Sequence, residues 1–358
     1  MNILFITDLY PVKNNESTTP RTLLDFVNEW GKLGYNVDVI KPNFIPNSFL
    51  RKKPFYKTGQ YENVFNVNYW TPFWFNIHHK LPKLTNYDIV VAHMPSGILF
   101  ADKLGLPFVA GIHCSDIDIL TKPLYKIHFK KRLEKALKNA KAIACRSFVL
   151  RDKLLKLHPE FEKKTFVAPS GIDERLLDEK NHSPFTTHHS PIKVLTCAHF
   201  KKRKNIDKVI EACKGLESFE LTVIGDGKER KALEKLDSNV TFLGRLSHDK
   251  VLEEMRKNDI FVLPSIGETF GMVYLEAMAS GCITVCTKGD GIDGIIKNGE
   301  NGFLVEPNSE SVKETLLNIK NLSQNKLNTL YTNSFSTIQN YILTTCAKRY
   351  LQQILKIL

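Results

Sequence analysis

The chain of 358 residues contains no apolar run that approaches the roughly 18 to 20 residues a membrane-spanning helix needs. No transmembrane segment is therefore predicted. The first residues, MNILFITDLY, enter a strand pattern directly, without the basic stretch and apolar segment of a secretory signal. We expect a cytoplasmic protein, and any role at a membrane would be exercised at the membrane surface.

Cysteine is limited to seven residues, an odd number, and most of them lie in apolar strand-like or helix-like runs: Cys114, Cys145, Cys197, Cys213, Cys282, Cys286 and Cys346. This pattern is typical of reduced core thiols and not of a disulfide framework. Cys282 and Cys286 lie close together, but no second Cys or His pair follows at zinc spacing. No structural zinc is expected.

Glycine is missing where a dinucleotide site would need it. In TVIGDGKER, Gly225 and Gly227 follow a strand pattern and open a helix pattern, so backbone amides could approach a ligand there, although a plain tight turn would use the same residues. The third glycine of the dinucleotide fingerprint is absent, and Arg230 stands in its place. FITDLYP, after the first strand pattern, has no glycine. A nicotinamide-dependent dehydrogenase is therefore not expected.

The composition, with 42% apolar and 25% charged residues, is that of a globular protein, and the length predicts two domains. Strand and helix patterns alternate over residues 2–113 and again over residues 192–288, which predicts parallel sheets with crossover helices. A polar stretch with two prolines, Asn181 to Pro191, reads as a linker or surface loop. In such sheets ligands bind beyond the carboxyl ends of the strands.

The net charge of +12 belongs almost entirely to the first half, because residues 1–172 hold 25 Lys and Arg against 14 Asp and Glu. The excess lies in LRKKPFYK and in KPLYKIHFKKRLEKALKNAKA, where apolar residues recur at helical spacing: Phe129, Leu133, Ala136, Leu137 and Ala140. A basic amphipathic helix suits an anionic membrane surface. We favour the interpretation that this segment contacts a membrane. Alternatively, its apolar stripe faces the core. DNA or RNA binding is a remote alternative, since no nucleic-acid motif is present.

Two glutamates stand out in GETFGMVYLEAMASG, residues 267–281. A helix is predicted to begin near Gly271, and the free amides of its first turn would form an anion site. Glu268 precedes this turn, while Glu276 lies about five residues into the helix, some 7 to 8 Å deeper at about 1.5 Å per residue. A ligand with an anionic middle and hydroxyl groups at both ends fits this layout. A nucleotide sugar is such a ligand.

The segment ETFGMVYLE, followed by AMASG, resembles the donor-binding signature of the retaining glycosyltransferases of family 4. Other segments agree in order over most of residues 1–310: VAPSGID, CAHFKKRKNIDKVIEA, TVIGDGKER, VTFLGRLSHDKVLEEMRKNDIFVLPS and GIIKNGENGFLV. The resemblance implies the GT-B fold, in which two Rossmann-like α/β domains face each other across a cleft. It implies an acceptor-side domain over 1–180, a nucleotide-sugar domain over 191–335 and a C-terminal helix, 336–358, that crosses back to the first domain.

The resemblance also implies roles for single residues. Glu276 would hold the ribose hydroxyls, Glu268 would face the donor sugar, and Lys204 would neutralise the diphosphate. Amides around residues 269–271 would contact the sugar and diphosphate. The implied donor-binding set is His199, Lys204, Gly225, Glu268, Thr269, Phe270, Gly271 and Glu276. His113 resembles a family histidine near the two sugars, so the implied catalytic set is His113, Lys204 and Glu268, with Asp116 on the acceptor side.

Two segments depart from the family pattern. The family commonly has Arg where this chain has His199. A neutral imidazole cannot replace a guanidinium, so either His199 binds protonated, or the adjacent run of residues 201–203 compensates. The first-domain loop, NNESTTPRT, lacks the usual paired glycines. There we expect side-chain contacts to the acceptor instead, from Ser17, Thr18, Thr19 and Arg21.

The resemblance implies transfer of a sugar from a nucleotide-diphosphate sugar to an acceptor hydroxyl, with retention of configuration and without a metal or cofactor. A UDP-sugar is the favoured donor and GDP-mannose the next. Asp116 and Asp118 form an Asp-x-Asp pattern, but it lies outside the donor domain and is not expected to bind a metal. A nucleotide-sugar 2-epimerase on the same fold is the alternative, and detection of an epimer by NMR without acceptor would distinguish it.

The basic first half suggests where the acceptor is met. We expect a glycan or lipid-linked acceptor at the inner face of the plasma membrane, to which the protein would bind peripherally. This points to bacterial-type surface polysaccharide assembly, such as capsule or lipopolysaccharide.

Overall fold

The computed structural model describes residues 1–11, 21–44, 55–57, 64–69, 84, 86–125, 129–177 and 191–358. The chain forms two compact units: unit 1 comprises Met1–Ser170 with Leu343–Leu358, and unit 2 comprises Gly171–Ile342. The chain therefore passes between the units after Ser170 and after Ile342, whereas the sequence suggested 180 and 335 as the ends of the two domains. The expected acceptor contacts Ser17, Thr18 and Thr19 lie outside the described residues, as does most of the expected linker.

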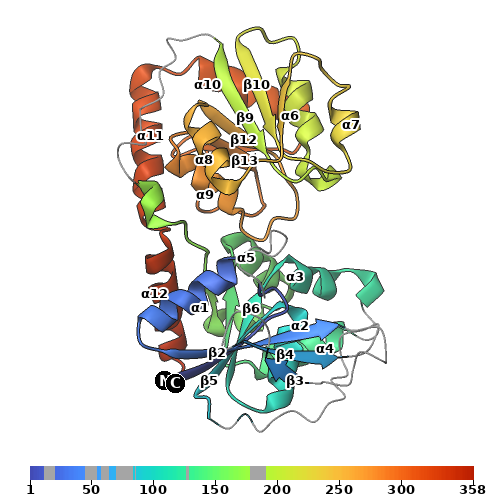
Figure 1. Cartoon of the computed structure of the whole chain (residues 1–358), viewed down its shortest axis with the longest axis vertical. Helices are drawn as coiled ribbons and strands as arrows, with labels where there is room; N and C mark the ends of the chain where they lie inside the picture. The colour runs from blue at the N-terminus through green and yellow to red at the C-terminus, as the bar shows by residue number, and fades with distance from the viewer. Residues whose placement is uncertain are drawn as a thin grey trace. The chain divides into compact units, whose positions relative to one another are not determined.

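Unit 1 is built on an eight-stranded sheet with the order β3-β4-β2-β1-β5-β6-β7-β8, in which every pairing is parallel except that of β3 with β4. The strands are β1 Asn2–Ile6, β2 Asn36–Phe44, β3 Phe55–Lys57, β4 Val64–Tyr69, β5 Ile89–His93, β6 Phe108–Ile112, β7 Ala142–Cys145 and β8 Thr165–Val167. The central strands β1, β5, β6 and β7 are buried almost throughout because helices flank the sheet (Figure 1).

The helices of unit 1 are α1 Thr22–Lys32, α2 Met94–Leu104, α3 Cys114–Thr121, α4 Lys130–Asn139, α5 Phe148–Leu157 and α12 Leu343–Leu355. Helix α2 packs against α4, and α1 packs against α12. The C-terminal helix is tied to α1 by a buried hydrogen bond, in which Trp30 Nε1 donates to the Ala347 carbonyl over 3.0 Å. The helix that returns to unit 1 thus begins at Leu343, after α11 has ended.

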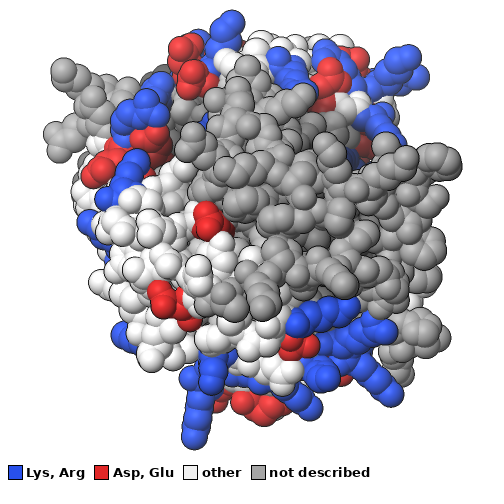
Figure 2. Space-filling model, turned by 60° about the horizontal axis from the view of Figure 1, so that its bottom comes forward, with Lys and Arg blue, Asp and Glu red and all other residues white. Residues whose placement is uncertain are grey.

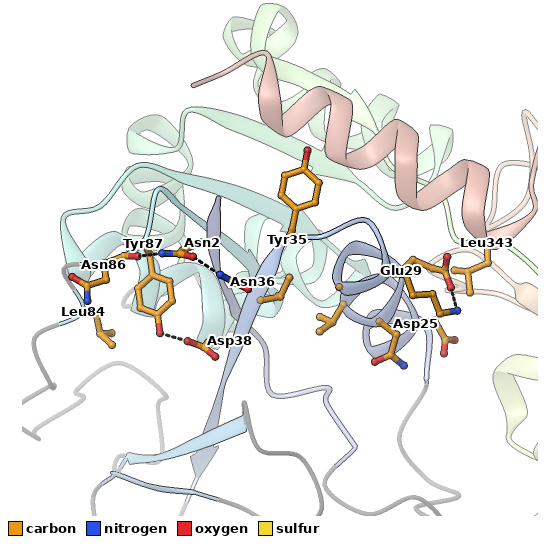
Figure 3. A pocket seen from close by; sticks show the side chains of 15 residues that line it. Asn2, Asp25, Glu29, Tyr35, Asn36, Asp38, Leu84, Asn86, Tyr87 and Leu343 are labelled. Carbon is orange, nitrogen blue, oxygen red and sulfur yellow. Dashed lines mark hydrogen bonds and ion pairs between the residues drawn. The ribbon is translucent and has the colours of Figure 1, made fainter.

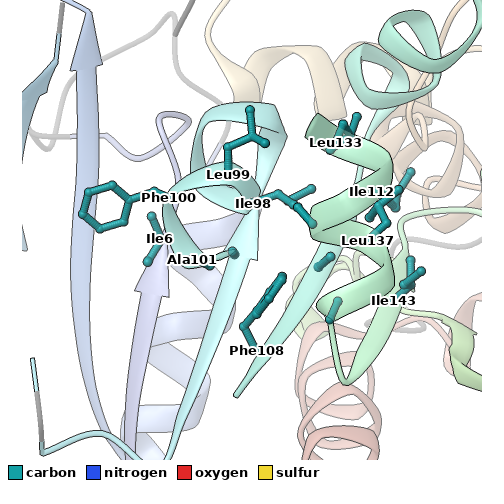
Figure 4. Close-up of a cluster of buried hydrophobic side chains, with 14 of the residues drawn as sticks. Ile6, Ile98, Leu99, Phe100, Ala101, Phe108, Ile112, Leu133, Leu137 and Ile143 are labelled. Carbon is teal, nitrogen blue, oxygen red and sulfur yellow. The ribbon is translucent and has the colours of Figure 1, made fainter. Parts of the chain in front are cut away.

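Helix α4 corrects the interpretation of the basic amphipathic segment. Leu133, Ala136 and Leu137 are fully buried, and they belong to the same core cluster as Ile98 of α2 and Ile112 of β6 (Figure 4). The expectation that this stripe lies on a membrane is wrong for the apolar residues, because the sheet and α2 already cover them. Only the basic side of α4 remains exposed, at Lys131, Arg132, Lys135 and Lys138. In the described part of the chain, no helix is long and apolar enough to cross a bilayer.

Unit 2 contains a six-stranded parallel sheet with the order β11-β10-β9-β12-β13-β14. Its strands are β9 Ile192–Cys197, β10 Phe219–Ile224, β11 Thr241–Gly244, β12 Ile260–Leu263, β13 Ile283–Thr287 and β14 Phe303–Val305. Its helices are α6 Ile206–Cys213, α7 Arg230–Leu233, α8 His248–Arg256, α9 Met272–Ala279, α10 Ser309–Lys320 and α11 Gln324–Gln339. The predicted alternation of strands and helices is confirmed in this unit.

One helix of unit 2 is shorter than its sequence pattern suggests. A helix pattern opens after Gly227 in the sequence, but α7 comprises only Arg230–Leu233. Leu233 is the one buried residue of this turn. Short helices depend on tertiary packing for their stability, and a single buried leucine gives little packing to extend this one.

Candidate functional site

The charged groups of the candidate site in unit 2 follow three neighbouring strands. Lys204 ends a 3₁₀ turn after β9, Glu268 follows β12, and Asp290 follows β13. Strand β12 pairs with both β9 and β13 in parallel, so the carboxyl ends of all three meet at one edge of the sheet. This edge is where an α/β sheet binds its ligands.

Lys204 and Glu268 form the centre of this site. Lys204 Nζ lies 2.5 Å from Glu268 Oε1, and both side chains are 15% exposed. Arg203 Nη1 lies 3.1 Å from the same oxygen. Burial raises the pKa of Glu268, but the charge and hydrogen bond of Lys204, the charge of Arg203 and a hydrogen bond from Ser265 lower it more, so the pKa lies below its ordinary value. Glu268 is therefore ionised at neutral pH.

Asp290 fixes the loop that carries Glu268, a role that sequence analysis missed. Its buried carboxylate accepts hydrogen bonds from the backbone N–H groups of Gly267 at 2.5 Å, Glu268 at 2.9 Å and Gly291 at 2.7 Å. The one signal in the sequence is an aspartate between Gly289 and Gly291 directly beyond β13. A carboxylate that accepts several backbone N–H groups holds a loop in one conformation.

Helix α9 begins where the sequence predicted. Gly271 caps it in the left-handed region, at φ +93°, and Met272 is its first residue. In the first turn, the Tyr274 N–H donates to the Gly271 carbonyl over 3.1 Å. The N–H groups that precede it have no acceptor within the helix, and such helix ends favour anions. Thr269 and Phe270 lie in the loop that leads to it, and Phe270 is buried. The anion site expected at this end of the helix stays a prediction.

Glu276 lies in the apolar helix α9 with its side chain 16% exposed. Its Oε1 is 2.9 Å from Nε2 of His248, the first residue of α8. This hydrogen bond raises the pKa of His248, burial opposes it, and the charges of Glu276, Asp249 and Asp173 raise it further. Sequence analysis gave His248 no role.

Two other residues expected to bind the donor, His199 and Gly225, do not belong to the cluster of Lys204 and Glu268. His199 is exposed just beyond β9. Gly225 has φ +135°, and a Cβ there would lie 1.9 Å from the Ala198 carbonyl oxygen. Its N–H donates to the Gly244 carbonyl over 2.8 Å, so this amide is already used within the fold. The need for glycine at 225 thus has a structural cause in the packing of the β10 turn.

In unit 1, His113 belongs to a buried hydrogen-bonded chain. Its Nε2 lies 3.0 Å from His93 Nδ1, and His93 Nε2 lies 3.1 Å from Tyr350 Oη of α12. Burial, followed by the charge of Arg146, lowers the pKa of His113 to about 3. Burial, followed by the charges of His113 and Arg146, also lowers the pKa of His93. Both imidazoles are therefore neutral at neutral pH.

Two carboxylates lie near this chain of hydrogen bonds: Asp116 is buried, and Asp8 is partly buried. Asp116 Oδ2 accepts the His113 N–H over 2.8 Å, and Asp8 Oδ2 accepts the Ser96 hydroxyl over 2.8 Å. Within the described part of the chain, Oδ1 of each aspartate is buried without a hydrogen-bond partner. Burial raises the pKa of both groups. Asp8 was not foreseen.

The remaining first-half candidates are more exposed. Arg21 lies 4.0 Å from Asp25 at the start of α1. Asp118 pairs with Lys122 at 2.6 Å, so the two carboxylates of the Asp-x-Asp pattern have different partners. Among the residues with described positions, no three His, Cys, Asp or Glu side chains gather closely enough to hold a metal ion.

A hollow of about 990 Å³ in unit 1 lies apart from these residues (Figure 3). Asn2 and Asn36, at the amino ends of β1 and β2, line it, so it lies at the opposite edge of the sheet from the strand ends that carry His93 and His113. Its polar side chains bond to one another: Tyr87 Oη donates to Asp38 Oδ2 over 2.7 Å, and Asn36 Nδ2 donates to Asn2 Oδ1 over 3.0 Å. We do not include it in the candidate site.

Two Rossmann-like α/β units define the fold as GT-B, which confirms the predicted fold class. Solved structures agree: HepE of Anabaena in complex with UDP has a TM-score of 0.73 at 18% identity over 99% of this chain and 100% of that one. Sucrose-phosphate synthase of Thermosynechococcus elongatus has a TM-score of 0.71 at 17% identity, over 99% and 98%.

The sequence comparison names the family. Residues 19–176 match the family described as Glycosyltransferase Family 4, and residues 178–334 match the one described as Glycosyl transferases group 1. The chain belongs to the glycosyltransferases of family 4, as the sequence motifs indicated.

Two relatives illustrate the range of the match. An uncharacterized glycosyltransferase of Methanocaldococcus jannaschii is 31% identical over 63% of this chain, and the match spans 62% of that relative. A putative teichuronic acid biosynthesis glycosyltransferase of Bacillus subtilis is 25% identical, over 86% of each chain.

The neutral imidazole of His93 generates a prediction for stability. Because its pKa is lowered in the folded state, the unfolded chain binds more protons below about pH 6.5, so His93 costs stability as pH falls. His93→Gln removes this titration and keeps hydrogen-bonding groups. From pH 7 to pH 5 the stability of the variant should improve relative to wild type by up to about 2 kcal/mol. Urea titrations of both proteins at both pH values measure this effect. A difference in unfolding free energy between variant and wild type that is the same at pH 7 and pH 5 would contradict the prediction.

Proposed function

We propose that the protein transfers a glycosyl unit from a nucleotide-diphosphate sugar to an acceptor hydroxyl with retention of configuration. A UDP-sugar is the favoured donor, and GDP-mannose is the next. One observation carries the proposal: Lys204 and Glu268 are paired at 2.5 Å at the strand ends of unit 2, where the anion-binding end of α9 follows Glu268 in the chain.

Each part of the donor has a counterpart in this arrangement. The ribose hydroxyls bind the Glu276 carboxylate, the diphosphate binds the first-turn amides of α9 and Lys204, and the sugar hydroxyls bind Glu268. As the glycosidic bond breaks, negative charge grows on the departing diphosphate. A fixed Lys204 cation then stabilises the transition state more than the ground state, which is the condition for catalysis.

Arg203 takes the place of the arginine that the family has at position 199. Arg203 Nη1 already contacts Glu268, and it also donates to the Ile266 carbonyl over 3.2 Å. His199 is exposed just beyond β9. Since Lys204, Arg203 and the end of α9 supply positive charge to the diphosphate, the proposed reaction requires no metal ion or other cofactor.

The acceptor is a glycan or a lipid-linked glycan that binds unit 1. Asp116, Arg21 and His113 are the described residues proposed for the acceptor side. Relatives support this class of acceptor: a lipopolysaccharide core biosynthesis glycosyltransferase of Rhizobium meliloti is 33% identical over 38% of this chain and 39% of its own length. The alpha-monoglucosyldiacylglycerol synthase of Acholeplasma laidlawii is 24% identical over 62% of each chain.

The proposed donor site is tested by nucleotide binding. UDP should raise the thermal unfolding temperature, because a ligand at 100 times its Kd stabilises the folded state by about 2.7 kcal/mol. Lys204→Ala and Glu276→Ala should abolish most of this shift. Lys201→Ala removes an exposed lysine of the same basic run and should leave it unchanged. A full UDP shift in both site variants would refute the proposed site.

We further propose that the protein works at an anionic membrane surface on the cytoplasmic side. The exposed Lys and Arg of α4 support this, and Lys and Arg side chains crowd part of the rim of the face in Figure 2, with a few Asp and Glu among them. Contact would be electrostatic, since the apolar stripe of α4 is buried.

Flotation with liposomes tests this membrane contact. The protein should associate with phosphatidylglycerol-rich vesicles at low salt and dissociate near 1 M salt, where charges are screened beyond about 3 Å. A variant with Lys131, Arg132, Lys135 and Lys138 changed to Gln should bind more weakly. Neutral phosphatidylcholine vesicles are the control, and absence of association at low salt would defeat the proposal.

A further inference from the structure

We infer that His248 is a positioning residue for donor recognition: it holds the Glu276 carboxylate in place for the ribose hydroxyls. This inference rests on the proposed function. It assigns a role to a side chain that the sequence did not single out and that belongs to a different helix from Glu276.

One carboxylate oxygen of Glu276 is hydrogen-bonded within the protein, and the other remains available to a ligand. His248 Nε2 contacts Oε1 at 2.9 Å, and Oε2 has no hydrogen-bond partner among the described residues. An ionised carboxylate offers about four lone-pair sites, so one contact from His248 still leaves room for two hydroxyl donors. A glutamate side chain that is already held loses less rotamer freedom when the ligand arrives, which favours binding.

The position of His248 has no explanation in its own helix. It is the first residue of α8, where the helix dipole disfavours a cation. Its side chain is 63% exposed, so it does not fill the core. Apart from Tyr274, whose buried hydroxyl bonds to Ser265 and to the Leu263 carbonyl, the rest of α9 is apolar. The contact with Glu276 is therefore the interaction that accounts for a histidine at this place.

The surrounding charges keep the imidazole protonated over a wider pH range. Glu276 faces it from α9, Asp249 lies next to it on α8, and Asp173 lies before the 3₁₀ turn at Glu174–Leu177. Arg175, Glu253 and Arg256 line the same hollow, of about 260 Å³, as His248. The hydrogen bond to Glu276 raises the pKa of His248. The ion pair is then complete below that pKa and weakens as pH rises through it.

The test compares UDP with 2′-deoxy-UDP by calorimetry, because only a correctly placed Glu276 distinguishes the two ligands. Wild type should bind UDP at least about tenfold more tightly than 2′-deoxy-UDP, as expected for one hydrogen bond to a charged group. The measured ratio is the Kd of 2′-deoxy-UDP divided by the Kd of UDP. In His248→Ala this ratio should fall to about threefold or less, through weaker UDP binding alone. His248→Gln restores a donor and should recover most of the ratio. Lys250→Ala changes an exposed residue of the same helix and should retain all of it.

The pH profile supplies a second readout that a purely structural role would not change. The titration of the phosphates is common to both ligands and cancels in the ratio. The wild-type ratio should decline from pH 6 to pH 9, while that of His248→Ala should stay flat. A ratio in His248→Ala equal to that of wild type overturns the inference. A larger ratio also overturns it, because His248 would then compete with the ribose.

The same measurements separate this inference from the proposed function. If wild type binds UDP and 2′-deoxy-UDP equally, Glu276 does not recognise the ribose, and the proposed donor geometry fails whatever the role of His248. If UDP does not bind, GDP and 2′-deoxy-GDP are compared in the same way. If neither nucleotide binds, the proposed function falls and the inference falls with it.

Discussion

The candidate site depends on one ion pair, that of Lys204 with Glu268. The pair joins the turn after β9 to the loop after β12, and Asp290 anchors that loop from the end of β13. A buried carboxylate without a cation beside it would tend to take up a proton. Lys204 therefore helps to keep Glu268 ionised in the absence of ligand. In the proposed reaction, the diphosphate takes over the contact with Lys204 while Arg203 remains beside Glu268, so neither charge is left without a partner.

The strand ends of unit 1 carry neutral imidazoles, in contrast to the charged pair in unit 2. His93 and His113 lie where β5 and β6 end, and burial keeps both neutral. Tyr350 completes the chain of hydrogen bonds, so the C-terminal helix α12 forms part of the polar core of this unit. Because the pKa of each imidazole is lowered, both are weak general bases. For the proposed reaction this agrees with a mechanism that depends on the charge placed at the donor diphosphate.

Features with a local cause could be predicted from the sequence. The alternation of strands and helices, the start of α9 near Gly271 and the unusual carboxylates Glu268 and Glu276 all follow from residues close together in the chain. The groups that hold these carboxylates could not be predicted, because their contacts join distant residues. Asp290 lies 22 residues from Glu268, His248 lies 28 from Glu276, and His93 lies 257 from Tyr350.

Helix α4 shows a second limit. Its apolar period was predicted correctly, but a period does not indicate which surface will cover it. The membrane and the core present the same apolar environment to Leu133 and Leu137, and here the core covers them. Likewise, the glycine at 225 suggested an amide open to a ligand, whereas its N–H is bonded to Gly244.

A crystal structure of the protein with UDP tests the central claim most directly. The account predicts the diphosphate at the first turn of α9 with Lys204 Nζ moved from Glu268 to a phosphate oxygen, and the ribose hydroxyls on Glu276. Nucleotide bound elsewhere, with the Lys204–Glu268 contact unchanged and Glu276 free of ribose, would contradict it.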